Sequence, residues 1–305
     1  MISRTLGALT YDPCIGSCDY IQGEVPTYPF VEQNNNVFGL NATFMAQMEE
    51  LDKTCGYAEY REKYLTFPPS GLQPPTFFNY SSPTQLLCDI FDITINAGLA
   101  VNPCSNVYEI TTQCPIPADP LGFPTDIAFT YPGQPIYFNR TDVKLAIHAP
   151  LDVNWAECSA GSVFVGDGGP EQNGDMSLDP IQHVLPQVIE ATNRVLVANG
   201  DLDMIVLTNG TLLSIQNMTW NGQMGFRTQP STPIIITLPD LQYGPAFVAN
   251  GIGGLDNPQG VMGTQHYERG LMWAQTHLSG HMEPQFQPRS SYRHLQWLLG
   301  HIETL

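Results

Sequence analysis

The stretch that decides the fold is RVLVANGDLD, residues 194–203. Its first five residues form an apolar run of strand length, and the Asn-Gly-Asp that follows is a strong turn signal. A strand that ends in this way presents its acids at the carboxyl edge of a sheet, where α/β enzymes carry out their chemistry. The stretch therefore predicts a buried strand over residues 194–198, followed by a turn in which Asp201 is a turn-former and Asp203 lies at a position suited to catalysis.

A second segment of the same kind lies nearer the C-terminus. The run LMWAQT, residues 271–276, predicts another strand, and SGHMEP, residues 279–284, follows it with His281 on a glycine-containing loop. An acid that precedes a histidine along the chain fits the order serine, aspartate, histidine of the α/β hydrolases. The two segments together predict an acid–histidine pair.

At these residues the chain resembles the serine carboxypeptidases, secreted or vacuolar α/β hydrolases, and it is most similar to those of filamentous fungi. The family's Gly-Asp-x-Asp motif carries the catalytic aspartate at its second Asp, here Asp203, and its Gly-His-Met-x-Pro motif carries the histidine, here His281. WNGQMGF, residues 220–226, resembles the Trp-x-Gly and Gly-Phe patterns of the family. The resemblance implies a serine-type exopeptidase that acts on peptide or protein C-termini through an acyl-enzyme, without a cofactor or metal.

The family's nucleophile motif, Gly-Glu-Ser-Tyr-Ala-Gly, is not found here, because no serine in the chain has a glycine two positions before it. Such a turn is sharp and strained and needs small neighbours, so Ser17, Ser162 and Ser279 are poor substitutes. LGALTYDP, residues 6–13, resembles the strand and turn that follow the nucleophile helix. We therefore expect the C-terminal portion of such an enzyme, inactive alone, with the N-terminal segment of the same protein missing.

The resemblance also implies substrate contacts. Met282, after the histidine, and Val206, three residues past the aspartate, correspond to residues that form the pocket wall in the family. Val206 stands where other members carry cysteine. Glu283 replaces a commoner apolar residue, and its carboxylate either raises the pKa of His281 or faces solvent.

The composition is strongly acidic. The 29 Asp plus Glu against 11 Lys plus Arg give a formal net charge of -18, which repels phosphate backbones and anionic lipid. We therefore expect no nucleic-acid partner and no membrane partner. The apolar stretches are also far too short to cross a bilayer.

Five N-glycosylation sequons indicate a secreted or vacuolar protein. They lie at Asn41, Asn79, Asn139, Asn209 and Asn217. The first thirty residues contain acids and prolines and no sustained apolar core, so no signal peptide is visible.

Seven cysteines make an odd count, so at least one cannot pair within the chain. They are Cys14, Cys18, Cys55, Cys88, Cys104, Cys114 and Cys158. The resemblance implies that Cys158 is unpaired here, because its family counterpart bridges to the missing half. Sequence does not fix the pairing of the other six. The spacing of Cys14 and Cys18 would suit a metal pair, but no second pair stands at zinc-ligand spacing.

The chain reads as one partial domain over residues 1–305. A disulfide-rich, mainly helical insertion, or lid, is expected over about 20–125, and the C-terminal core with the acid and the histidine over about 130–305. Strands are expected over about 5–12, 194–198, 234–236 and 271–276, and helices near 44–51, 86–91, 143–148, 181–189 and 209–216. A last helix over residues 292–299 is expected to begin at Ser290 or Ser291 as N-cap.

Two alternatives remain open from sequence. One is a noncatalytic secreted glycoprotein that keeps the lid and binds peptides or partners. The other is a chain complemented by a separate N-terminal chain.

Overall fold

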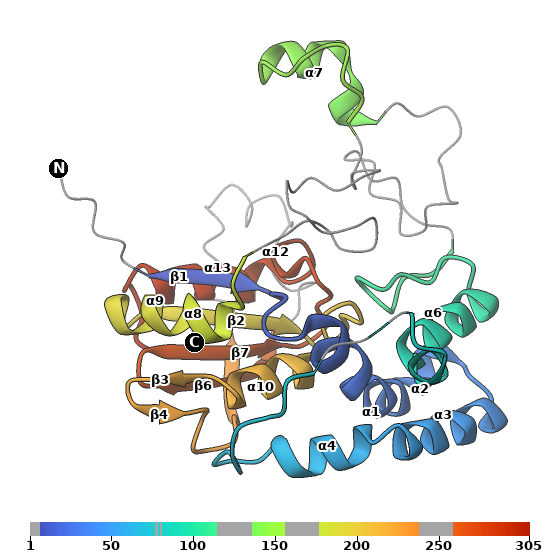
Figure 1. Ribbon diagram of the computed structural model, residues 1–305. Helices are drawn as coiled ribbons and strands as arrows, with labels where there is room; N and C mark the ends of the chain where they lie inside the picture. The colour runs from blue at the N-terminus through green and yellow to red at the C-terminus, as the bar shows by residue number, and fades with distance from the viewer. Residues whose placement is uncertain (1–6, 77–78, 80, 115–135, 156–176, 238–258) are drawn as a thin grey trace.

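A five-stranded mixed sheet forms the centre of the molecule, in a computed structural model that describes residues 7–76, 79, 81–114, 136–155, 177–237 and 259–305. The strand order is β1-β2-β7-β6-β5 (Figure 1). The strands are β1 (Ala8–Tyr11), β2 (Val195–Gly200), β7 (Leu271–Thr276), β6 (Gly260–Glu268) and β5 (Thr232–Ile236). β1, β2 and β7 run parallel, whereas β6 and β5 are antiparallel to their neighbours.

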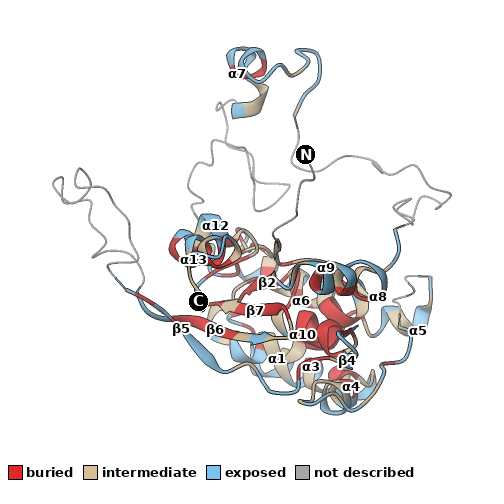
Figure 2. Ribbon diagram, turned by 90° about the vertical axis from the view of Figure 1, so that its left-hand side faces the viewer, coloured by how far each residue is buried: buried red, intermediate tan, exposed pale blue. Residues whose placement is uncertain are grey.

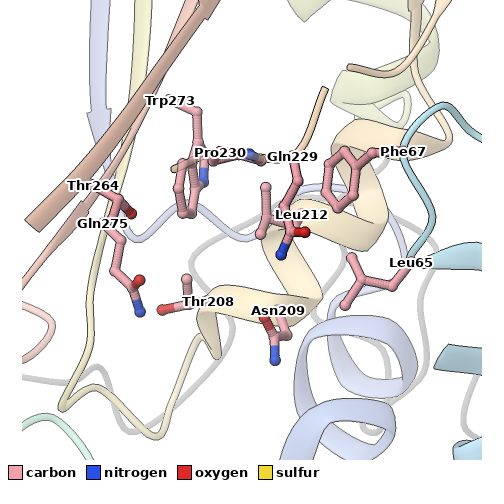
Figure 3. Close-up of a pocket in the computed structure, with 10 residues that line it drawn as sticks. All are labelled: Leu65, Phe67, Thr208, Asn209, Leu212, Gln229, Pro230, Thr264, Trp273 and Gln275. Carbon is pink, nitrogen blue, oxygen red and sulfur yellow. The ribbon is translucent and has the colours of Figure 1, made fainter. Parts of the chain in front are cut away.

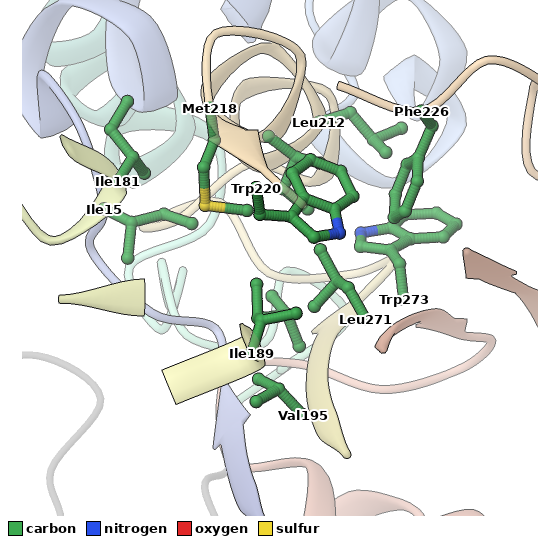
Figure 4. Close-up of a cluster of buried hydrophobic side chains, with 12 residues drawn as sticks. Ile15, Ile181, Ile189, Val195, Leu212, Met218, Trp220, Phe226, Leu271 and Trp273 are labelled. Atoms are coloured by element: carbon green, nitrogen blue, oxygen red, sulfur yellow. The ribbon is translucent and has the colours of Figure 1, made fainter. Parts of the chain in front are cut away.

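Strand β2 is buried along its whole length (Figure 2), which explains its apolar run over residues 195–198. Val195 and Val197 lie in a cluster on one face of the sheet that includes Trp273 (Figure 4). Leu196 lies in a second cluster on the opposite face, with Trp297. Full burial of one such aliphatic side chain contributes about 1.5–3 kcal/mol. The predicted strand over residues 194–198 is therefore confirmed, as a central strand covered on both faces.

Helices cover both faces of the sheet. Three helices contribute to the Trp273 face: α8 (Pro180–His183), α9 (Leu185–Thr192) and α10 (Thr208–Gln216), with the small hairpin of β3 (Thr219–Trp220) and β4 (Gln223–Met224) beside them. Helix α13 (Pro288–Leu298) covers the other face and packs against α12 (Glu283–Phe286). This sheet covered by helices is the expected α/β architecture.

A helical insertion follows β1. It contains the π-helix η1 (Cys18–Glu24) and helices α1 (Val25–Gln33), α2 (Asn35–Phe38), α3 (Ala42–Thr54), α4 (Tyr57–Tyr64), α5 (Pro83–Leu86) and α6 (Ile90–Val101). It packs on α10, where Leu213 joins an apolar cluster with Ile21 and Tyr57. Beyond the insertion lie η2 (Tyr137–Asn139) and α7 (Thr141–Ala146).

Three disulfides join the six cysteines whose pairing sequence left open. They are Cys14–Cys18, Cys55–Cys88 and Cys104–Cys114. Cys14 and Cys18 are thus partners of each other. The expectation that Cys158 is unpaired concerns a residue outside the described part of the chain.

Three sequence-based expectations differ from the structure. The helix expected near 86–91 is instead the end of α5 and the start of α6, with residues 87–89 between them. The last helix begins at Pro288 with Gln287 as N-cap, not at Ser290 or Ser291, because a proline is well suited to the first turn. Strand β6 was not predicted at all. Its pairing with β5 shifts register between Ile234 and Ile235, opposite Gly263 (φ +152), and this irregularity breaks the alternation that marks a strand.

Candidate functional site

The acid and the histidine follow two neighbouring parallel strands. β2 and β7 pair in register from Val195 opposite Leu271 to Gly200 opposite Thr276, so both strands end at the same level. Asp203 comes three residues after β2, and His281 five residues after β7. This pairing brings together two residues that are 78 positions apart in the chain.

The two side chains share a hydrogen bond. His281 Nδ1 donates to Asp203 Oδ2 at 2.9 Å. Asp203 is fully buried and also accepts from the backbone N–H groups of Ile205 (2.8 Å) and Val206 (3.3 Å). The His281 side chain is 30% exposed, and its Nε2 has no hydrogen-bond partner among the described residues. One ring nitrogen is therefore oriented by the acid while the other is open to a reactant.

Burial sets the protonation of this pair. It lowers the pKa of His281, so the ring stays neutral to lower pH than a free imidazole and then keeps a lone pair that can accept a proton. Burial also raises the pKa of Asp203, and the N–H groups of Ile205 and Val206 oppose that rise by stabilising the carboxylate. The arrangement suits a general base with an orienting acid.

Glycines allow the two loops to approach each other. A Cβ on Gly200 would lie 2.3 Å from the carbonyl oxygen of Ser279, and one on Gly280 would lie 1.9 Å from that of Tyr108. Neither distance is possible for a real side chain, so the glycine in each motif is a packing requirement.

A segment of the insertion holds both loops in place. The backbone N–H of His281 donates to the Tyr108 carbonyl (2.8 Å), and that of Met204 donates to the Val107 carbonyl (2.8 Å). The Cys104–Cys114 disulfide closes the segment that carries these carbonyls. Sequence reasoning did not find this contact, because backbone carbonyls leave no residue-specific signal.

The three residues expected to contact substrate, Val206, Met282 and Glu283, lie within three positions of Asp203 or His281 in the chain but differ in burial. Val206 is buried and its backbone bonds Asp203, while Met282 is half-buried. Glu283 is fully buried and accepts from the Thr276 hydroxyl at 2.5 Å. The expectation that it either faces solvent or raises the pKa of His281 is therefore wrong, because burial lowers that pKa.

A second acid–histidine pair spans the same two loops and was missed. His277 Nδ1 and Asp201 Oδ2 are 2.8 Å apart. Their hydrogen bond is the main cause that raises the pKa of His277. The sequence did contain a signal for this pair: Asp201 directly follows strand β2, and His277 directly follows strand β7.

Asp12 is a third acid at the site. One oxygen of Asp12, one of Asp203 and a ring nitrogen of His281 all lie within 4.8 Å of one another. Such a set could hold a cation, but His281 Nδ1 and Asp203 Oδ2 already bond each other and Asp203 receives two further N–H donors. The atoms of the acid–histidine pair that could bind a cation are thus already hydrogen-bonded.

A cavity of about 270 Å³ opens between α10 and the sheet (Figure 3). Its lining is uncharged and consists of Leu65, Phe67, Thr208, Asn209, Leu212, Gln229, Pro230, Thr264, Trp273 and Gln275. Neither residue of the catalytic-type pair lines it, and neither does Val206 or Met282.

The five sequon asparagines differ in surroundings. Asn41, Asn79 and Asn209 are exposed, and Asn41 caps α3 by accepting from Phe44 N. Asn217 accepts from Gln73 N, and both ends of the Asn139 side chain bond the backbone of Trp155.

An acid–histidine pair at the carboxyl edge of parallel strands is the arrangement that α/β-hydrolase sites use. A family model described as Serine carboxypeptidase matches residues 7–301, and the chain belongs to that family.

Relatives of known sequence agree. The chain is 61% identical to serine-type carboxypeptidase F of Aspergillus niger, over 98% of this chain and 56% of the relative. It is 41% identical to a probable serine carboxypeptidase of Arthroderma benhamiae, over 97% of this chain and 52% of the relative. The chain thus spans about half the length of these relatives.

A solved structure shows the same fold. The prohormone-processing carboxypeptidase Kex1(delta)p of Saccharomyces cerevisiae superimposes with a TM-score of 0.60 at 18% identity, over 96% of this chain and 54% of that one. Among the described residues, no helix is long and apolar enough to cross a membrane.

Proposed function

We propose that this chain supplies the acid and the histidine of a serine-type carboxypeptidase that removes residues from the C-termini of peptides or proteins. The observation that carries the proposal is the hydrogen bond between His281 Nδ1 and buried Asp203, with His281 Nε2 open to a reactant. Family membership supports the reaction class.

In this mechanism His281 Nε2 takes the proton of a serine hydroxyl as the hydroxyl attacks the scissile carbonyl. The ring then returns the proton to the leaving amine, and the acyl-enzyme that remains is hydrolysed by water. Asp203 fixes the tautomer with the proton on Nδ1 and stabilises the cation that forms. Val206 and Met282 are proposed to contact the substrate beside the pair.

We further propose that the serine comes from another part of the same protein. Two observations support this: no serine in the chain has a glycine two positions before it, and the chain spans 56% of its Aspergillus niger relative. A separate N-terminal chain would serve the same purpose. The 305 residues alone are then inactive, because triad members act as a unit.

The test is hydrolysis of a blocked dipeptide at pH 4 to 6 by the purified 305-residue chain, with a fluorophosphonate label for reactive serines. We expect neither turnover nor labelling from this chain, and both from the full-length protein. Labelling of the short chain at any serine would overturn the proposal that the nucleophile lies elsewhere. An inactive full-length protein would overturn the proposed function itself.

We also propose a secreted or vacuolar location, with glycans at the exposed sequons. The five sequons and three disulfides support it, because disulfides persist in oxidising compartments. Mass spectrometry of the protein from its native host checks the glycans.

A further inference from the structure

Asp12 is a buried acid without an assigned role. It directly follows β1, and its side chain is 3% exposed. Its backbone has a φ of 41°, in the left-handed region that costs a residue other than glycine of order 1 kcal/mol. Strain of this kind persists only where the surrounding structure enforces it, so the position of this carboxyl is closely determined.

The two oxygens of Asp12 have different surroundings. Oδ1 accepts from the backbone N–H of Gly200 (2.9 Å) and from Asn199 Nδ2 (3.1 Å). Oδ2 is buried and has no hydrogen-bond partner among the described residues. A carboxyl with donors on one oxygen only has its other oxygen free to carry a proton.

The neighbour of Asp12 is the acid of the candidate pair. One oxygen of Asp12 lies within 4.8 Å of an oxygen of Asp203. A hydrogen bond between the two carboxyls needs a proton, because two ionised carboxylates offer acceptors and no donor. Asp203 receives N–H donors from Ile205, Val206 and His281, on both of its oxygens. The charge is therefore better stabilised on Asp203, and the proton on Asp12.

The surroundings strongly disfavour a second negative charge. The titratable groups that face the two acids are Tyr11, Glu109, His281 and Glu283. Two of these four are carboxylic acids, and no lysine or arginine of the described residues forms an ion pair with either acid. Burial, followed by the charge of Asp203, raises the pKa of Asp12.

We propose that Asp12 is a positioning residue for the acid–histidine pair: its neutral carboxyl keeps its proton on Oδ2 and donates a hydrogen bond to Asp203, so that the two acids carry a single negative charge behind His281. The bond holds the Asp203 carboxylate in the orientation that His281 Nδ1 needs. It also adds no charge, so His281 is not driven towards its cationic form.

This role serves the proposed carboxypeptidase, but it can be measured without turnover on the 305-residue chain. The chain is labelled with 13C at aspartate Cγ, and the Asp12 signal is assigned by its loss in Asp12→Asn. We expect the Asp12 carboxyl to remain protonated from pH 4 to 7 while the Asp203 carboxyl remains ionised. An Asp12 carboxyl that titrates near pH 4, or a proton on Asp203 instead, overturns the proposal.

Asp12→Asn gives a second readout, through 15N shifts of the His281 ring. The amide keeps a donor in place of the Oδ2 proton and keeps the Oδ1 acceptor, so the pKa of His281 should not change. Loss of an ionised carboxylate at this distance would instead lower that pKa by about one unit or more, and such a fall contradicts the proposal. Asp12→Ala removes the donor and should shift the Nδ1 proton signal of His281, whereas the control Asp201→Asn should not.

The outcomes separate this role from the proposed function. A protonated Asp12 in a full-length protein that lacks carboxypeptidase activity would leave the positioning role intact and remove the reaction. An active enzyme with an ionised Asp12 would do the reverse.

Discussion

Two acid–histidine pairs span the same two loops: the inner pair, Asp203 with His281, and the outer pair, Asp201 with His277. The distances from Nδ1 to Oδ2 are nearly equal, 2.9 and 2.8 Å. The acids differ in burial, since the Asp203 side chain is 0% exposed and that of Asp201 is 24% exposed. The pKa of His281 is lowered by burial, whereas that of His277 is raised by its hydrogen bond to Asp201.

The comparison shows that one chemical pair has opposite properties in two environments. Desolvation dominates in the inner pair and keeps the histidine neutral, as a general base requires. Solvent reaches the outer pair, where the cation is stabilised by the acid and the pair holds the two loops together. A contact distance alone therefore does not identify a catalytic pair.

The largest expected effect separates the two pairs by activity. In the full-length protein, Asp203→Asn should lower kcat on a blocked dipeptide by roughly 10⁴-fold, because an amide favours the wrong tautomer of His281. Asp201→Asn is the matched control and should change kcat by less than about threefold, because its partner His277 has no part in the proposed mechanism. Equal losses in the two variants would show that burial does not distinguish the pairs.

The second-largest effect is expected from the packing of Gly280, which lies between His277 and His281 in the chain. Gly280→Ala would bring a Cβ to 1.9 Å from the Tyr108 carbonyl oxygen, which is backbone and cannot move aside. We expect it to destabilise the 305-residue chain by about 3 kcal/mol in urea unfolding. Gly23→Ala is the control, because its nearest neighbour would be 3.7 Å away. Equal unfolding midpoints would mean that the loop relaxes freely.

The buried acid after His281 gives a pH dependence of intermediate size. Burial raises the pKa of Glu283 well above its usual range, so the folded state binds a proton that the unfolded state releases. Its contribution to stability is present at acid pH and is lost as pH rises above about 4.5, by up to about 1.4 kcal/mol per pH unit.

Glu283→Gln stays neutral at every pH and should therefore flatten the fall in urea stability between pH 5 and 7. The exposed Glu62→Gln serves as control and should leave the slope unchanged. An unchanged slope in Glu283→Gln would mean that this acid is ionised in the folded chain.

The sequence predicted those parts of the fold and the candidate site that leave a pattern in consecutive residues. The apolar runs of β2 and β7 predicted both strands because these strands are buried on both faces, and the two motifs predicted Asp203 and His281. It did not predict the bond between Asp12 and Gly200, which are 188 residues apart, or the carbonyl of Tyr108 between the loops. Such contacts depend on strand order and on backbone groups, which a single sequence does not reveal.

The smallest expected effect concerns the outer pair. The raised pKa of His277 means that its contribution to stability is fully present below about pH 6.5 and is lost as pH rises through the folded-state pKa. Because both side chains are partly exposed, solvent screening limits this contribution to a few tenths of a kcal/mol. Asp201→Asn should therefore lower the urea midpoint slightly at pH 5 and not at pH 8.5, and His277→Gln should match it. A loss that is equal at both pH values would mean that the outer pair holds the loops by hydrogen bonding alone, and that its charge contributes nothing.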